Sequence, residues 1–128
     1  MMNPSNSPIQ NGEANQHDFP WSRSEKVIAR KAFDAALKRE LHELIQEAKQ
    51  MASQIQQPSD LWDLEHYLTQ RRREIDRKYD YRYSELTLVF GKLLCQRWLA
   101  EEELRGLGED KLKSIRSCAK FLAEMAAA

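Results

Sequence analysis

The stretch between Asp60 and Trp98 contains no proline and a single glycine, Gly91. Its apolar residues recur at helical spacing; they are Leu61, Leu64, Leu68, Ile75, Tyr79, Leu86, Phe90 and Leu93. One helix over the whole stretch would be about 55–60 Å long, at about 1.5 Å per residue. A compact monomer of this chain length is only about 36 Å across, so this helix would extend beyond its own globule.

The apolar stripe of such a helix must be buried against another molecule, and a second copy of the chain is the commonest solution. We therefore predict a homodimer and leave a higher oligomer open. Its interface is expected at Leu61, Leu64, Leu68 and Ile75. The alternative is a break in the helix near residues 79 to 84, because aspartate and tyrosine have weak helix propensity.

A first helix is predicted from Ser22 to about Gln57. Ser22 and Glu25 have the spacing of a capping box, which marks a helix start. A stripe at spacings of three and four follows; its members are Phe33, Leu37, Leu41, Leu44, Ala48, Met51 and Ile55. Pro58 then ends this helix, and Ser59 or Asp60 caps the next one.

The C-terminal part is predicted as a short helix from Glu101 that ends at Gly106, followed by a last helix opened by Gly108. The apolar face of the last helix comprises Leu112, Ile115, Cys118 or Ala119, and Leu122. Residues 1 to 20 are rich in Asn, Gln, Ser and Pro, which predicts a disordered tail. The expected fold is all-α: one domain over residues 21–128, with long antiparallel helices forming a homodimer and a small C-terminal helical head.

Composition and motifs argue against several classes of function. Twenty basic and twenty acidic residues cancel, so no overall field attracts nucleic acid or an anionic membrane. No apolar run reaches the length of a membrane span, and no secretion signal precedes the first helix, which predicts a cytoplasmic protein. Glutamine at position 46 replaces the second histidine that a zinc protease needs after His42. We expect no catalytic residues, no metal and no cofactor.

Arginines interrupt the stripe of the second helix, at Arg71 or Arg72 and at Arg82. A buried unpaired charge is very costly, so each arginine must meet a carboxylate, a partner or solvent. Available carboxylates are Asp63, Glu65, Glu74, Asp76 and Asp80. Two interpretations remain open, namely ion pairs that fix the dimer register and a face that binds a partner.

The same helix carries a second candidate site, formed by Trp62, Glu65, His66 and Arg72 within about two and a half turns. An exposed tryptophan and arginine on one face are typical of protein-binding hot spots. The alternative is that Trp62 closes the junction between two helices and that His66 is merely exposed. One enzymatic possibility also remains, because Arg-Arg-Glu-Ile-Asp in an all-helical dimer resembles the small helical chorismate mutases.

A more extensive resemblance covers about residues 20 to 116. It consists of Pro20-Trp21-Ser22, Asp60-Leu61-Trp62-x-Leu64, Arg72-x-Glu74-Ile75-Asp76-x-Lys78-Tyr79-Asp80-x-Arg82-x-Ser84, Val89-Phe90 and Glu102-Glu103-Leu104. Together these motifs resemble the cyanobacterial fluorescence recovery protein family. Glu65-His66 stands where that family commonly has His-Asp, and Arg97-Trp98 stands where members often have a glycine turn.

The resemblance implies a non-enzymatic, all-helical homodimer that binds no pigment. Such a protein binds the C-terminal domain of orange carotenoid protein, hastens its red-to-orange reversion and helps to detach it from phycobilisomes. The implied location is the cytoplasm, with peripheral association at the thylakoid through this partner. The resemblance also implies that Trp62 and Arg72 belong to the segment that acts on the partner and dimerises.

Overall fold

The computed structural model describes residues 20–128, which lie in helices and the segments that join them. The helices are α1 (Arg23–Ser53), α2 (Pro58–Lys78), α3 (Leu86–Cys95), a short 3-10 helix η1 (Glu101–Leu104) and α4 (Glu109–Ala127). The predicted all-α fold is confirmed, and so are the helices after Trp98. The tail predicted for residues 1 to 20 lies outside the described residues except for Pro20.

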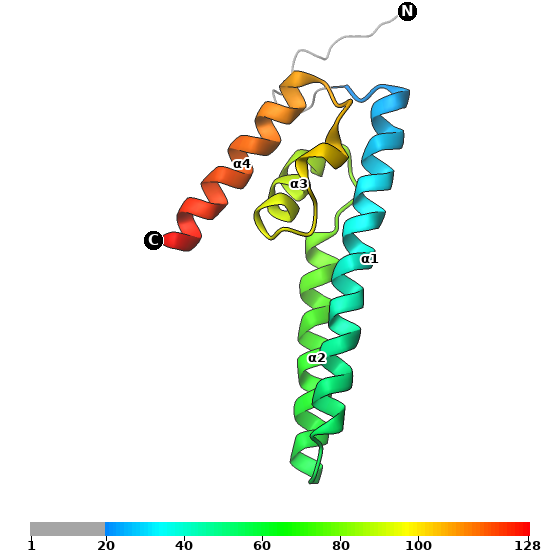
Figure 1. Cartoon of the computed structure of the whole chain (residues 1–128), viewed down its shortest axis with the longest axis vertical. Coiled ribbons are helices and arrows are strands. Elements are labelled where there is room, and N and C mark those ends of the chain that lie inside the picture. The colour runs from blue at the N-terminus through cyan, green and yellow to red at the C-terminus, as the bar shows by residue number, and fades with distance from the viewer. Residues whose placement is uncertain (1–19) are drawn as a thin grey trace, which may run out of the picture.

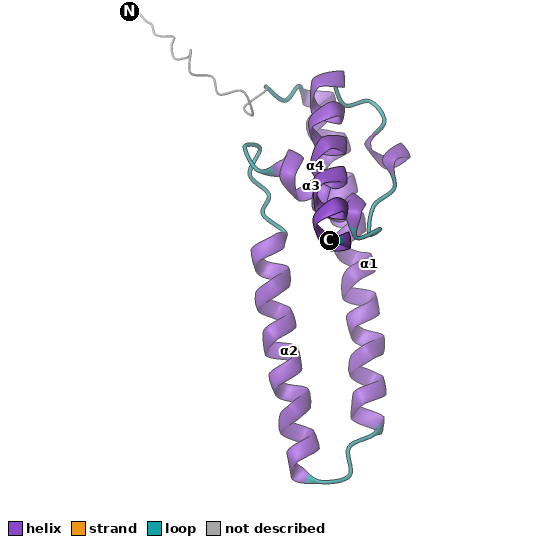
Figure 2. Ribbon diagram, turned by 90° about the vertical axis from the view of Figure 1, so that its left-hand side faces the viewer, coloured by secondary structure: helices purple, strands orange, loops and turns teal. Residues whose placement is uncertain are grey.

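α1 and α2 lie antiparallel and side by side, and α3, η1 and α4 gather around the first half of α1 (Figures 1 and 2). We call residues 37–78 the arm, and residues 20–36 with 79–128 the head. At the tip of the arm, α1 ends at Ser53 rather than at the predicted Gln57. The cap of α2 is Gln57, not Ser59 or Asp60. Asp60 instead accepts hydrogen bonds from the backbone N–H groups of Gln56 and Gln57, at 3.0 and 3.3 Å.

The predicted capping box at the start of α1 is confirmed. The Ser22 hydroxyl accepts a hydrogen bond from the Glu25 N–H at 3.2 Å, and the Glu25 carboxylate accepts one from the Ser22 N–H at 2.9 Å. The other Glu25 oxygen accepts a hydrogen bond from the Gly108 N–H at 2.7 Å. One carboxylate thus serves the first turns of both α1 and α4.

The prediction of one continuous helix from Asp60 to Trp98 is wrong, and its alternative is confirmed, because residues 79–85 separate α2 from α3. Tyrosines stand at every second position of this linker from 79 to 83, and all three pack on α1. The rings of Tyr79 and Tyr81 lie 5.4 and 4.8 Å from that of Phe33, and the Arg30 guanidinium lies 3.9 Å from the centre of the Tyr81 ring. Tyr83 follows at 5.0 Å from the Lys26 ammonium. These contacts with α1 offset the helical hydrogen bonds that the linker gives up.

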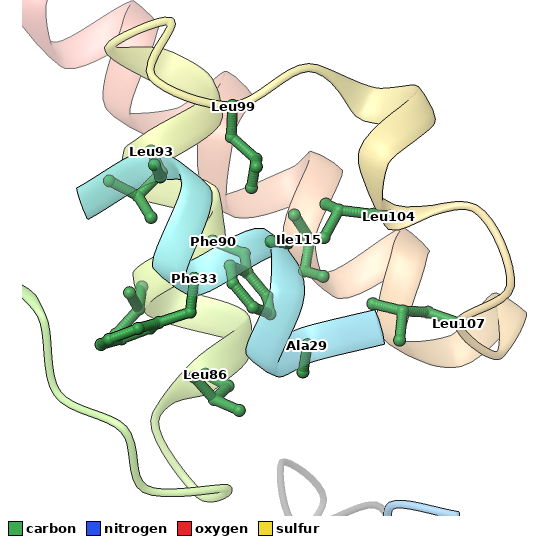
Figure 3. Packing of buried hydrophobic residues seen from close by; sticks show 12 residues of the cluster. Ala29, Phe33, Leu86, Phe90, Leu93, Leu99, Leu104, Leu107 and Ile115 are labelled. Carbon is green, nitrogen blue, oxygen red and sulfur yellow. The ribbon is translucent and has the colours of Figure 1, made fainter. Parts of the chain in front are cut away.

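The hydrophobic core lies in the head (Figure 3). Small residues on α1 let α3 approach closely, and α4 closes the other side. The largest fully buried side chains are Phe90, Leu86, Leu93, Leu104 and Ile115. In the arm, by contrast, Ile75 is the only apolar side chain that is buried, among the residues that the structure describes. The head therefore has a core of its own, whereas the arm leaves most of its apolar stripe uncovered.

The turn after α3 places Arg97 at φ 69°, a left-handed conformation that glycine adopts more readily than other residues. The sequence departs from the glycine turn of the resembling family at this point. Arg97 nevertheless adopts the glycine-like backbone, and the Trp98 N–H donates a hydrogen bond to the Leu93 carbonyl at 2.9 Å. Arg97 thus takes a backbone conformation that glycine would adopt at lower cost.

Candidate functional site: the arm and its junction with the head

Large apolar side chains of the arm are exposed to solvent. On α2, Leu61 is 46% and Trp62 is 63% exposed, and Leu41 and Ile45 are exposed on α1. The α1 stripe predicted from the sequence is thus only partly buried within one chain. Leu41 and Ile45 line a shared hollow on α1 with Leu37, and exposed apolar surface of this kind often marks a protein interface.

A groove of about 640 Å³ runs between the two helices of the arm. Leu37, Leu41 and Leu44 of α1 form one wall, and Ile75 of α2 lies opposite. Arg72 and Asp76 also line this groove. Their ion pair is long, at 3.8 Å, and the Arg72 side chain is 84% exposed. Such pairs contribute little, so the Arg72 guanidinium is available to another molecule.

The other predicted partner-binding residues share this part of α2. Trp62, Glu65 and His66 are all exposed, and Glu65 accepts a hydrogen bond from the Thr69 hydroxyl at 3.1 Å. Trp62 does not close a helix junction within the chain. At about 100° per residue, Glu65 and Arg72 lie within about 20° of each other around the helix, next to the apolar stripe, whereas Trp62 lies about 80° and His66 about 120° away from Arg72. The structure therefore does not bring all four residues onto one face of α2, and their role in binding stays a prediction.

Two of the predicted interface residues differ in their surroundings. Leu61 is exposed, whereas Ile75 is already buried between α1 and α2 of the same chain. Leu64 and Leu68 are half-buried. A second copy of the chain would thus cover mainly the residues nearer the tip of the arm, and the homodimer stays a prediction.

Glu40 is a functional candidate that the sequence did not reveal. It is 3% exposed, on the side of α1 that faces α2 and the linker. Its carboxylate lies 2.7 Å from the Lys78 ammonium, accepts a hydrogen bond from the Tyr79 hydroxyl at 2.8 Å and lies 3.4 Å from the Arg71 guanidinium. Lys78 also donates to the Gln96 side chain at 2.6 Å. This group, which we call the Glu40 cluster, joins α1, the end of α2 and the end of α3.

Burial alone would raise the pKa of Glu40. The hydrogen bonds from Lys78 and Tyr79, together with the Lys78 charge, outweigh burial and lower the pKa below its ordinary value. The carboxylate is therefore ionised at neutral pH and balances the cations around it. The predicted need of Arg71 for a carboxylate is met by Glu40 and by Glu74, at 3.1 Å.

A second ion pair fastens α1 to the head. The Arg39 guanidinium binds both carboxylate oxygens of Glu103, at 2.9 and 2.6 Å, and donates to the Trp98 carbonyl at 2.9 Å. Bidentate pairs of this kind fix orientation as well as distance. Together with the Glu40 cluster, this pair holds the end of the arm on the head.

Comparison with known proteins identifies the family of this chain. The sequence model of the family described as "Photoprotection regulator fluorescence recovery protein" matches residues 21–119. The chain belongs to the fluorescence recovery protein family. The family is one of photoprotection regulators, and the resemblance found in the sequence is confirmed.

Individual relatives agree with this assignment. The fluorescence recovery protein of Synechocystis sp. PCC 6803 is 42% identical over 104 residues, which cover 81% of this chain and 95% of the relative. Its solved structure has a TM-score of 0.76 and covers 79% of this chain and 99% of that one. The structure of the Fremyella diplosiphon protein is 44% identical, has a TM-score of 0.75 and gives the same coverage.

Several other site types can be assessed within residues 20–128. No described helix is long and apolar enough to cross a membrane, and no three His, Cys, Asp or Glu side chains are grouped as metal ligands there. The pentapeptide that resembles chorismate mutase does not surround one cavity. Arg72, Ile75 and Asp76 line the open groove, whereas Glu74 binds Arg71 and lines a different pocket, and Arg73 lines neither.

Proposed function

We propose that this chain binds the C-terminal domain of orange carotenoid protein, accelerates its return from the red to the orange form and helps to detach it from phycobilisomes. It does so without catalysis or pigment of its own, in the cytoplasm and at the thylakoid surface through its partner. The observation that carries the proposal is the exposed Arg72 at an apolar groove, with the exposed Trp62 on the same helix, in a chain of the fluorescence recovery protein family.

The physical basis of the proposal is differential binding. A protein that binds one state of a two-state partner more tightly shifts the equilibrium by the difference between the two affinities. To accelerate the return, it must also lower the free energy of the barrier between the states. Exposed aromatic and arginine side chains beside an apolar surface supply contact area and directional hydrogen bonds for such selective binding.

The direct test is to mix the purified chain with light-activated orange carotenoid protein and to time the loss of the red form in darkness. Acceleration that depends on the concentration of the chain is expected. An unchanged dark recovery rate at saturating concentrations would contradict the proposal.

Arg72→Leu is expected to reduce this acceleration about thirtyfold, which corresponds to the loss of about 2 kcal/mol at one hot-spot residue. The guanidinium is a planar fork that leucine does not replace. Arg73→Leu is the matched control, because Arg73 is exposed on the same helix and outside the groove lining. Trp62→Ala is expected to behave like Arg72→Leu. If Arg72→Leu keeps full activity, the surface that binds the partner does not lie on this part of the arm.

We further propose a homodimer, in which a second copy covers the exposed stripe of the arm around Leu61, Leu64 and Leu68. Leu61→Glu is expected to weaken dimerisation about tenfold to a hundredfold, because it places a carboxylate on apolar surface. Val27→Glu makes the same change at an exposed apolar residue of the head and serves as the control. Light scattering coupled to gel filtration measures the outcome, and a monomeric wild type at micromolar concentration would contradict the proposal.

A further inference from the structure

A second pocket, of about 480 Å³, lies at the junction of arm and head and is lined by the ends of α2 and α3 and by the last turns of α4. α2 contributes polar side chains to its lining, namely Glu74, Arg77 and Lys78, and α4 contributes an apolar wall of Leu122 and Ala126. Lys92 and Cys95 of α3, with Gln96 after its end, complete the lining. We call it the junction pocket.

The cations of the junction pocket differ in their partners. Lys78 is occupied by Glu40 and Gln96. The one carboxylate in the lining, that of Glu74, binds Arg71 instead. Arg77 and Lys92 form no ion pair with any residue between 20 and 128. The pocket therefore offers two uncompensated cations.

A simpler role for these cations is to balance the partial negative charge at the ends of two helices. Arg77 lies in the last turn of α2 and Lys92 in the last turn of α3. This effect is worth only about 0.3–1 kcal/mol and requires neither a pocket nor an apolar wall. It leaves unexplained why cations from two helices and three apolar residues of α3 and α4 line the same hollow.

We propose that the junction pocket binds a carboxylate side chain from an acidic segment of the partner protein, with Arg77 and Lys92 as its charged contacts. This inference rests on the proposed function. An arginine fork and a lysine together suit a carboxylate, and Leu122 and Ala126 suit an apolar residue next to it. A free phosphate or a nucleic acid would gain nothing from the apolar wall, and the chain has no net charge to attract either.

The Glu40 cluster gives this pocket its shape. Lys78 bridges Glu40 of α1 and Gln96 after α3, so it ties the end of α2, which carries Arg77, to the end of α3, which carries Lys92. A partner that occupies the pocket thereby contacts arm and head together. Its affinity depends on the angle between them as well as on the two cations.

The test compares Arg77→Glu, Lys92→Glu and the double variant with Lys31→Glu, which makes the same charge change on an exposed part of α1 outside this pocket. The affinity for light-activated orange carotenoid protein is measured by titration. Each pocket variant is expected to bind about tenfold more weakly, and the control within about twofold of wild type. The double variant should lose less than the product of the single losses, because both cations contact one carboxylate.

Arg77→Gln and Lys92→Gln repeat the comparison without charge reversal, so that a folding defect is not mistaken for lost binding. Circular dichroism and gel filtration check every variant. Pocket variants that lose thermal stability yet bind as wild type does would overturn the inference in favour of the helix-end role and leave the proposed function standing. Failure of the wild type itself to bind would overturn both.

Discussion

Glu40→Ala is expected to lower the free energy of unfolding by about 3–5 kcal/mol, the cost of removing one partner from a buried ion pair. The substitution removes the only carboxylate partner that the half-buried Lys78 has among the described residues, which leaves it Gln96 alone, and the acceptor of the Tyr79 hydroxyl. Unfolding in urea measures the change, at one protein concentration for all variants because dimerisation also contributes to stability. Glu43→Ala is the control, since Glu43 is exposed on the same helix.

Acid should reduce the difference in stability between wild type and Glu40→Ala. The pKa of Glu40 lies below its ordinary value of 4.5, so the stabilisation is complete above about pH 4.5 and is lost as the pH falls through the lower folded value. The pKa of Glu25 is lowered too, against the effect of burial, by hydrogen bonds from Ser22, Gly108 and Lys111. Glu25 is present in wild type and variant alike, so subtracting their stabilities isolates Glu40. A difference between wild type and Glu40→Ala that does not change with pH would show that the carboxylate charge has no part in it.

Gly91→Val is expected to lower stability by about 3 kcal/mol, because it overfills the contact between α3 and α4. A Cβ at this position would lie 2.6 Å from both the Cβ and the Sγ of Cys118, and 3.3 Å from the Ile115 carbonyl oxygen. Gly91→Ala should cost less, since alanine adds one carbon and favours the helix by about 1 kcal/mol. Thermal and urea unfolding report both values.

Cys118→Gly provides the matched background for this test, because it removes the two closest atoms. In that background Gly91→Ala should be less destabilising than in wild type, and the difference is their coupling energy. Equal effects in the two backgrounds would show that the close approach of α3 and α4 is not the reason for glycine at position 91.

The parts of the fold that depend on local contacts could be predicted from the sequence. Ser22 and Glu25 lie three residues apart and satisfy each other's backbone partners, and Gly108 stands immediately before the helix that it caps. Pro58 begins α2, where its missing N–H and fixed φ suit the first turn, although α1 already ends at Ser53. Each of these signals spans only a few residues, so the chain near it suffices to determine the structure.

The break after Lys78 could not be predicted in the same way, because its causes are distant in sequence. Glu40 holds Tyr79 across 39 positions, and Arg39 holds Glu103 across 64. Locally, residues 79–85 contain neither proline nor glycine, so helical spacing continues through them. The contacts that interrupt the helix exist only once α1 has folded beside it.

Of the candidate site, the exposed residues could be predicted and the buried one could not. The sequence singled out Trp62, Arg72 and the need of Arg71 for a carboxylate, but it considered only acids near Arg71 in the chain. Glu40 went unnoticed because a glutamate on a charged helix resembles a surface residue. The available signal was its place four residues after Ala36, on the side of α1 where the small residues Ala29, Ala32 and Ala36 already indicated close packing.

The tyrosines of the linker set a rule for its length. Tyr79, Tyr81 and Tyr83 recur every second residue, and their partners on α1, Phe33, Arg30 and Lys26, recur about once per helical turn. Two residues of chain advance at most about 6.6 Å, close to the 5.4 Å or so of one helical turn, so the two repeats stay nearly in step over this short span. Inserting one residue would turn every later ring away from α1, whereas inserting two would restore the facing. The linker therefore tolerates changes of length in pairs.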